Sequence, residues 1–195
     1  MVTVGIIDYG AGNIRSVVNA LKGLDVRVHI SSDPEVLSMT DKLILPGVGE
    51  ARSAMEALYR TGLIPWLRSS VQPFLGICLG MQLLFDRSTE RSTDCLGVLP
   101  GTIAIFNSGK VPHIGWNSVE HDSSDPLLSG IRSGAYFYFV HSYRASLGDF
   151  TLGRTSYVEE FSSVVRSGNR WGVQFHPEKS GDDGFRLIKN FVDLC

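Results

Sequence analysis

In the first half of the chain, short apolar runs alternate with segments of helical periodicity. The apolar runs predict strands buried on both faces of a sheet, and they cover residues 2–7, 26–30, 42–45 and 74–77. Residues 51–58 predict a helix. Another helix, ending near Gly23, is predicted by the spacing of Ile14, Val17, Val18 and Leu21. This alternation is typical of an α/β fold with a mostly parallel central sheet and helices on both faces.

The second half of the chain follows a different pattern. Helical spacing is scarce between residues 96 and 175, where short strand candidates dominate at 103–106, 136–140, 163–165 and 173–175. We interpret this part as an antiparallel extension of the same domain. A final helix is predicted by the spacing of Phe185, Ile188, Phe191 and Val192. Repeats and linkers are absent from the sequence, so we expect one domain over residues 1–195.

A cysteine between two glycines follows the fourth predicted strand. The sequence reads Gly76-Ile77-Cys78-Leu79-Gly80, and residues 81–85 can continue as a helix. This is the arrangement of a nucleophile elbow, a strained turn in which flanking side chains would crowd the backbone. A helix N-terminus favours the thiolate, and the N–H of Leu79 is placed to stabilise an oxyanion. The alternative is a buried structural cysteine beside two incidental glycines.

A second candidate group lies near the C-terminus, in Gln174-Phe175-His176-Pro177-Glu178. Pro177 would end the preceding strand, because proline cannot donate to a ladder. Residues two apart on extended backbone point to the same side, so we expect Glu178 to orient the imidazole of His176. With Cys78, these residues supply a nucleophile, a general base and the group that fixes the base. The alternative is a strand end with a solvated glutamate.

Three predicted loops directly follow strands and should therefore meet at one edge of the sheet, where α/β folds bind ligands. They are residues 9–13, residues 47–49 and the turn at Cys78. Gly47, Val48 and Gly49 can offer backbone N–H groups to an oxyanion, or they form an ordinary loop. The segment Gly10-Ala11-Gly12 suggests a dinucleotide loop, but Arg15 occupies the place of the third glycine, which disfavours nucleotide binding.

Together these motifs resemble the class I glutamine amidotransferase family, whose fold is flavodoxin-like. The resemblance is narrowed by four further segments, at residues 6–13, 45–49, 112–117 and 138–143. That set, in that order, is similar to the glutaminase subunits of imidazole glycerol phosphate synthase, from histidine biosynthesis. The resemblance runs from residue 4 to about residue 181. The chain departs from the family after Pro-Gly-Val-Gly, where Glu50-Ala51 stand and an aromatic residue is common two residues on.

The resemblance implies a reaction: hydrolysis of glutamine to glutamate and ammonia by Cys78, His176 and Glu178, with no metal or organic cofactor. It also implies that Gln82 binds the amino-acid part of glutamine, although Gln82 is equally a good helix former. Ser142 and Tyr143 lie in a segment that helps to bind glutamine in the family. His141 is more often a hydrogen-bonded histidine than a base.

The resemblance further implies a partner that receives the ammonia directly. That partner is the cyclase subunit of the synthase, a (β/α)8 or TIM barrel, in a heterodimer. Asn13, Arg15, Trp116 and Tyr138 are expected at the interface. We hypothesise that residues 46–49 hold an oxyanion donor out of alignment until the cyclase is bound.

Composition narrows the function classes. A net charge of −2 gives no electrostatic case for a nucleic-acid or membrane-surface partner. The sequence contains neither an apolar run near the roughly 20 residues of a membrane span nor a secretory signal at its start. The three cysteines, Cys78, Cys95 and Cys195, include no C-x-x-C pair, which argues against disulfides and a zinc site. We therefore expect a soluble cytoplasmic protein.

Three alternative functions stay open. The chain could be a glutaminase that serves another synthase, such as one for the pyridoxal cofactor, anthranilate or guanylate; residues 8–13 and 113–117 argue against it. It could be a stand-alone cysteine hydrolase or peptidase, which would ignore any partner. It could also be a non-catalytic subunit with a decayed site, although Cys78, His176 and Glu178 are all present.

Overall fold

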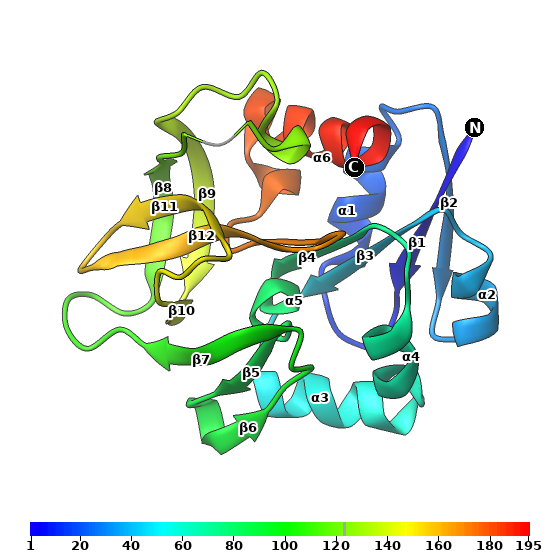
Figure 1. The fold of residues 1–195 in the computed structure, drawn as a ribbon, viewed down its shortest axis with the longest axis horizontal. Coiled ribbons are helices and arrows are strands. Elements are labelled where there is room, and N and C mark those ends of the chain that lie inside the picture. The colour runs from blue at the N-terminus through cyan, green and yellow to red at the C-terminus, as the bar shows by residue number, and fades with distance from the viewer. Residues whose placement is uncertain (123) are drawn as a thin grey trace.

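In the computed structural model of the protein, which describes residues 1–122 and 124–195, five parallel strands form the centre of the fold (Figure 1). Their spatial order is β2 (Val26–Ser31), β1 (Val2–Ile7), β3 (Lys42–Gly47), β4 (Phe74–Cys78) and β13 (Arg170–Val173). The four N-terminal strands are those that the apolar runs predict. Cys78 ends β4 and pairs in register with Gly47 at the end of β3, so their two loops begin side by side.

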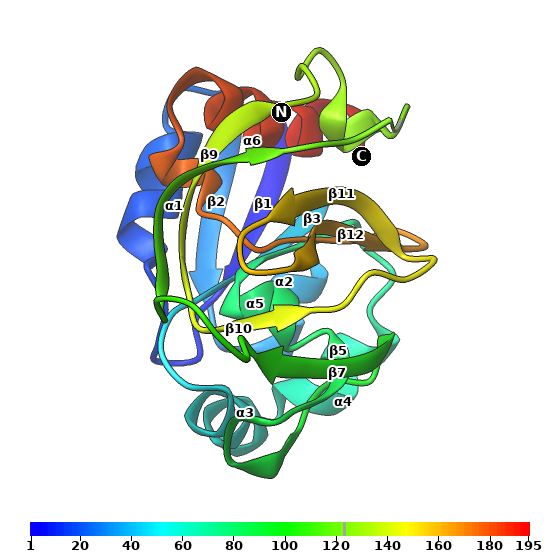
Figure 2. The same ribbon diagram turned by 90° about the vertical axis from the view of Figure 1, so that its left-hand side faces the viewer.

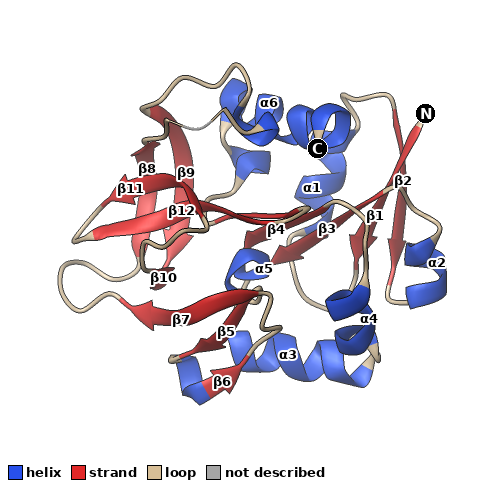
Figure 3. Ribbon diagram, viewed as in Figure 1, coloured by secondary structure: helices blue, strands red, loops and turns tan. Residues whose placement is uncertain are grey.

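Helices cover both faces of this parallel sheet (Figure 3). One face packs against α1 (Ile14–Leu21) and α6 (Gly181–Leu194), and the other against α2 (Pro34–Ser38), α3 (Ala51–Arg60), α4 (Leu63–Ser69) and α5 (Leu79–Gln82). Within β3, Ile44 belongs to the first hydrophobic core, whereas Leu43 and Leu45 belong to the second. All three are fully buried, which explains why the strand is apolar at successive positions.

The second half of the chain extends the sheet with antiparallel strands, as predicted. Strand β12 (Glu160–Ser167) pairs antiparallel with β13 and β11 (Thr151–Ser156), and β10 (Tyr143–Ala145) pairs antiparallel with β12 and β7 (Leu99–Ile105). Beyond β7 lie β5 (Phe85–Ser88), parallel to it, and β6 (Thr93–Asp94). The extension differs from the prediction in one respect, because β8 (His113–Val119) and β9 (Ala135–His141) form a separate antiparallel ribbon (Figure 2).

The prediction of a helix through residues 81–85 is wrong. Helix α5 ends at Gln82, and strand β5 begins at Phe85. The carbonyl groups of residues 83–85 accept hydrogen bonds from the backbone N–H groups of residues 96–99. These carbonyls are therefore engaged in a long-range loop contact that a continuing helix would have to break.

The prediction of a strand at residues 173–175 is also wrong. Strand β13 ends at Val173. After it, the N–H of Gln174 donates to the carbonyl of Ser163 in β12, whereas the N–H of His176 donates to the carbonyl of Tyr138 in β9. The chain thus crosses from one sheet to the other within three residues. A 3-10 turn, η3 (Pro177–Lys179), follows at once. Two further 3-10 turns are η1 (Glu90–Ser92) and η2 (Pro126–Leu128).

Helices α2 and α4 were not indicated by the sequence pattern. Helix α2 has only five residues, begun by the side chain of Asp33, which accepts from the N–H of Glu35. Helix α4 has seven residues and carries Pro65 in its first turn. Among the described residues, every helix is too short or too polar to cross a membrane.

Candidate active site

Cys78 lies at the junction between β4 and α5, in a backbone conformation with φ 54° and ψ −107°. A positive φ is uncommon for a residue with a side chain and marks local strain. The neighbouring glycines allow the turn: a Cβ on Gly80 would lie 1.9 Å from the carbonyl oxygen of Leu45, and one on Gly76 would lie 2.6 Å from that of Gly80. Close backbone contact therefore requires glycine at both positions.

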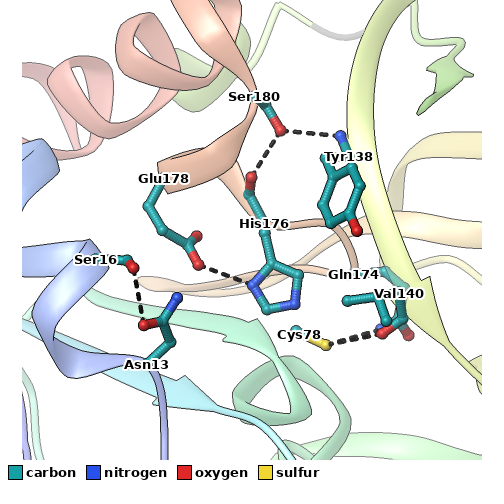
Figure 4. A network of polar contacts seen from close by, with 9 residues as sticks. All are labelled: Asn13, Ser16, Cys78, Tyr138, Val140, Gln174, His176, Glu178 and Ser180. Carbon is teal, nitrogen blue, oxygen red and sulfur yellow. Dashed lines mark hydrogen bonds and ion pairs between the residues drawn. The ribbon is translucent and has the colours of Figure 1, made fainter. Parts of the chain in front are cut away.

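The structure brings His176 and Glu178 together beside Cys78. The Nδ1 atom of His176 lies 2.8 Å from Oε1 of Glu178, and both side chains are almost completely buried. Two hydrogen bonds hold the backbone of His176. Its N–H donates to the carbonyl of Tyr138, and its carbonyl accepts from the hydroxyl of Ser180 at 2.6 Å. Figure 4 shows the imidazole next to the Cys78 sulfur.

The environment of His176 favours its protonated form. Burial lowers its pKa, but hydrogen bonds and charge interactions with Cys78 and Glu178 outweigh burial and raise the pKa from 6.5 to about 9. The other ring nitrogen, Nε2, is buried and has no oxygen or nitrogen partner among the described residues. An imidazolium beside a thiol favours the thiolate, so the pair can supply a nucleophile and an acid together.

A cavity of about 370 Å³ opens at this group. Its wall includes Cys78 and His176 together with Val48, Gly49, Leu79, Gln82, Glu90, Pro112, Val140, His141, Ser142 and Tyr143. The cavity is large enough for a small amino-acid substrate. The predicted substrate residues Gln82, Ser142 and Tyr143 thus all lie at the cavity. Of the predicted oxyanion residues, Leu79, Val48 and Gly49 lie at the cavity, whereas Gly47 is not part of its wall.

Gln82 has internal partners as well as a place in the cavity wall. Its Nε2 donates to the carbonyl of Tyr143 at 2.9 Å and to Oε1 of Gln174 at 3.0 Å. The residue is 6% exposed, and it ties α5 to the segment that carries Tyr143. Gln82 is therefore more than a helix former.

The loop of residues 47–49 runs along the rim. Gly47 is still part of β3, whereas Val48 is 41% exposed and Gly49 has φ +99°. Immediately after it, Glu50 forms an ion pair with Arg91, and the N–H of Ala51 donates to the Glu90 carboxylate at 2.7 Å. Glu50-Ala51 therefore attach this loop to the 3-10 turn η1.

The four predicted interface residues lie on three elements: the start of α1, strand β8 and strand β9. Asn13 precedes α1 near Glu178 and accepts from Ser16 at 2.8 Å (Figure 4), and Arg15 is exposed on the same helix. Trp116 of β8 is 56% exposed, and its ring meets that of Tyr138 edge-on across the ribbon, with 6.2 Å between centroids.

Several residues at the site were not singled out from the sequence. Gln174 is fully buried, and its Nε2 lies 3.8 Å from the Cys78 sulfur. Its spacing gave no reliable signal, because β13 ends at Val173 and a 3-10 turn follows at Pro177–Lys179, so that residues 174, 176 and 178 do not alternate along one strand. Glu90, Pro112 and Val140 reach the cavity from distant segments, for which the sequence offers no local signal.

The remaining cysteines are away from this chemistry. Burial, together with nearby charges, raises the pKa values of Cys95 and Cys195 to about 12. All three cysteines are free. Among the residues that the structure describes, His, Cys, Asp and Glu side chains nowhere form a group of three that could hold a metal ion.

The chain is similar to known proteins over nearly its whole length. The family model for glutamine amidotransferase class-I matches residues 5–194. Three relatives are named as HisH subunits of imidazole glycerol phosphate synthase, and the one from Legionella pneumophila carries the name HisH 2. The protein from Legionella pneumophila (strain Paris) is 44% identical, with 98% of both chains covered; that from Vibrio cholerae is 45% identical, with 97% covered. The protein from Bacteroides fragilis (strain YCH46) is 46% identical, with 98% of this chain and 99% of its own covered.

Solved structures share the fold. A crystal structure described as glutamine amidotransferase has a TM-score of 0.77 at 22% identity and covers 98% of this chain and 97% of its own. The structure of PurLQS from Thermotoga maritima has a TM-score of 0.74 at 19% identity and covers 98% of both. The chain therefore belongs to the class-I glutamine amidotransferase family and, within it, to the family of HisH subunits of imidazole glycerol phosphate synthase.

Proposed function

We propose that this chain hydrolyses glutamine with a Cys78–His176–Glu178 triad and passes the ammonia to a cyclase subunit. One observation carries the proposal: a strained cysteine, a buried imidazole and its buried carboxylate converge at one cavity. The family supports the wider assignment, in which the chain is the glutaminase subunit of imidazole glycerol phosphate synthase in histidine biosynthesis. We also propose that residues 1–195 form a single glutaminase domain.

The first half-reaction forms a thioester. The Cys78 thiolate at the nucleophile elbow attacks the side-chain carboxamide carbon of glutamine, so that a C–S bond forms. The C–N bond then breaks as the His176 imidazolium gives its proton to the leaving nitrogen, and ammonia departs. Glu178 holds Nδ1 of the ring, which directs Nε2 toward the reacting atoms and stabilises the cation.

The second half-reaction releases glutamate. Neutral His176 takes a proton from water, and the resulting hydroxide attacks the thioester carbon. The C–S bond breaks, and the thiolate of Cys78 returns beside the imidazolium. Protons and charges balance over the cycle, so no metal or organic cofactor is part of the proposal.

Each tetrahedral intermediate needs oxyanion donors. We assign the N–H of Leu79 as one and an N–H of Gly47, Val48 or Gly49 as the other. Loss of one such donor typically costs a hundredfold or more, roughly 3 kcal/mol. Gating of the second donor by the cyclase is the associated hypothesis, and it fails if residues 47–49 keep one backbone conformation in free and cyclase-bound protein. Gln82, Ser142 and Tyr143 are the proposed contacts for glutamine.

The outer face of the β8–β9 ribbon supports the partner proposal. Ile114, Trp116 and Tyr136 are 58%, 56% and 58% exposed and lie on one face, because their positions alternate with buried ones. Large exposed apolar patches mark protein interaction sites. The backbone of Tyr138 on this ribbon also binds His176, so the face adjoins the catalytic group.

We assign this face, with Asn13 and Arg15 of the neighbouring α1 region, to a TIM-barrel cyclase in a heterodimer. The cyclase would use the ammonia in the lyase step of the synthase. Direct transfer is needed because free ammonia protonates at neutral pH and escapes. A cytoplasmic location follows from the same proposal.

The test is glutamate release by the protein alone and with the cyclase and its nucleotide substrate. Strong stimulation by the cyclase, absent from the Cys78→Ala variant, is the expected result. Equal hydrolysis with and without the cyclase would instead assign the chain to a stand-alone hydrolase. Equal activity of the Cys78→Ala variant would remove the triad from the account.

A further inference from the structure

Gln174 contacts the nucleophile but takes no part in the proposed mechanism. Its side chain is fully buried, and its Nε2 lies 3.8 Å from the Cys78 sulfur (Figure 4). It reaches the sulfur from the segment between β13 and η3, two residues before His176. Amide N–H groups stabilise a thiolate, whereas carbonyl oxygens destabilise it. The role of Gln174 therefore depends on which end of its amide faces the sulfur.

The surrounding hydrogen bonds fix that orientation. The carbonyl of Tyr143 can only accept, so the end of the Gln82 amide that lies 2.9 Å away must be its NH₂ group. The same NH₂ group lies 3.0 Å from the Gln174 amide, which must therefore present its oxygen to Gln82. The Gln174 NH₂ group is left to face Cys78. Reversal of either amide would place two acceptors or two donors against each other.

A second set of bonds holds the Tyr143 carbonyl from the other side. Nδ1 of His141 lies 2.8 Å from this carbonyl and must donate to it. Nε2 of His141 is then the acceptor for Nδ1 of His113 at 3.0 Å, provided that both rings are neutral. Burial lowers the pKa of His141 to about 3 and that of His113 to about 4, so both are neutral at physiological pH. This series of hydrogen bonds ends at Asn117, whose amide nitrogen lies 3.3 Å from Nε2 of His113.

We propose that Gln174 is a further catalytic residue that donates a hydrogen bond to the Cys78 thiolate, and that Gln82 and His141 are positioning residues that fix its amide. The inference rests on the proposed function, because it assigns Cys78 as the nucleophile. From Asn117 and His113 on β8, successive donors lead through His141 to the Tyr143 carbonyl. This carbonyl also accepts from Gln82, which donates to Gln174 as well.

The resting thiol has a competing partner. The Cys78 sulfur lies 3.9 Å from the carbonyl oxygen of Val140, which can accept a hydrogen bond from a thiol but repels a thiolate. Gln174 acts in the opposite sense, because its N–H favours the charged sulfur. Other titratable groups around the sulfur are His176, Glu90 at the cavity wall and Tyr9, whose pKa is raised by burial and by the charge of Cys78. Because these groups also respond to pH, comparison of variants isolates the part due to Gln174.

The test is the pH dependence of iodoacetamide alkylation at Cys78 in full-length protein, followed by peptide mass spectrometry. Gln174→Met keeps the length of the side chain and removes the donor. We expect the pH profile of Cys78 alkylation to move to higher pH, with alkylation on its rising limb about tenfold slower at a given pH. The kcat for glutamine should fall by a similar factor while KM changes little. Gln82→Met should shift the alkylation profile in the same direction by a smaller amount.

Gln72→Met is the matched control, because Gln72 makes the same kind of amide contacts, to the Leu37 and Ser38 carbonyls, away from Cys78. Its alkylation profile should equal that of the unaltered protein. If Gln174→Met does not fold, Gln174→Leu replaces it, since the leucine side chain cannot donate a hydrogen bond. An unchanged alkylation profile in a folded Gln174 variant overturns the inference. Glutamine hydrolysis that fails in the unaltered protein, with normal alkylation, would instead contradict the proposed function.

Discussion

Replacement of Glu178 by Gln tests how the buried carboxylate supports His176. The two side chains are 2.8 Å apart and at most 2% exposed, so solvent screens their interaction little. Gln keeps the size of the side chain and a hydrogen-bonding group at Nδ1, but it removes the negative charge. Its effect should therefore reach the catalytic imidazole without leaving a large void.

The magnitude follows from the pKa of His176. Burial alone would lower this pKa, yet interactions with Cys78 and Glu178 raise it from 6.5 to about 9. The net preference for the imidazolium corresponds to about 3 kcal/mol, as an order of magnitude. Loss of the carboxylate leaves burial opposed only by Cys78, so the pKa in the variant should fall toward or below 6.5.

The assay is the pH dependence of kcat for glutamate release in the presence of the cyclase. In the proposed mechanism the leaving nitrogen takes its proton from the His176 imidazolium, so kcat should fall as pH rises through the pKa of that group. The alkaline limb should lie near pH 9 in the unaltered protein and near or below neutral pH in Glu178→Gln. At about pH 8, about 90% of His176 is protonated at a pKa of 9 but only about 3% at a pKa of 6.5, so kcat should be roughly 30-fold lower in the variant, and lower still if the pKa falls below 6.5.

Stability supplies an independent reading of the same pKa. A histidine whose pKa is raised on folding contributes stability that is complete below its unfolded value of 6.5 and is lost as pH rises through about 9. Urea unfolding should therefore show a decline of up to about 3 kcal/mol from this group over that interval, and a smaller one in Glu178→Gln. An alkaline limb that stays near pH 9 in the variant, with an equal loss of stability, would refute the reasoning.

Three further predictions concern the elbow, the C-terminal helix and the ribbon. Gly80→Ala should prevent folding or lower the melting temperature strongly, because its Cβ would lie 1.9 Å from the Leu45 carbonyl oxygen. The control Gly168→Ala, at φ +59° in open space, should lower the free energy of unfolding by only about 1 kcal/mol in calorimetry. Lys42→Met should cost about 1–3 kcal/mol in urea unfolding, because Lys42 donates to two carbonyl groups at the end of α6; an unchanged midpoint would contradict this. Trp116→Ala should leave glutaminase activity without cyclase within about twofold but weaken cyclase binding by about 2 kcal/mol in titration calorimetry; equal affinity would remove Trp116 from the interface.

The parallel sheet could be predicted because its signal is local. Every residue of β3 and β4 is buried, so each strand appears as an apolar run, and the turn at Cys78 carries its own glycines. The short spacing of His176 and Glu178 could also be recognised, although a 3-10 turn at Pro177–Lys179, and not an extended backbone, brings their side chains together. These features depend on neighbours in the sequence, which a pattern of spacing detects.

Features set by distant segments could not be predicted. Helix α5 ends at Gln82 because the segment at residues 96–99 takes the next carbonyl groups, and β13 ends at Val173 because the chain crosses to Tyr138. His113 and His141 are adjacent only through the register of β8 and β9. Gln82 likewise meets Gln174 across 92 residues of sequence. Pairing across such separations leaves no period in the sequence.

The most direct test of the central claim is detection of the covalent intermediate on Cys78. Glutamine is mixed with the protein, the cyclase and its nucleotide substrate, the reaction is quenched in acid during turnover, and the peptide containing Cys78 is weighed by mass spectrometry. We expect a glutamyl thioester on Cys78 that is absent from the Cys78→Ala variant. It should accumulate when hydrolysis of the thioester by water is slowed. Rapid glutamate release with unmodified Cys78 at every quench time, or a thioester on Cys95 or Cys195, would contradict it.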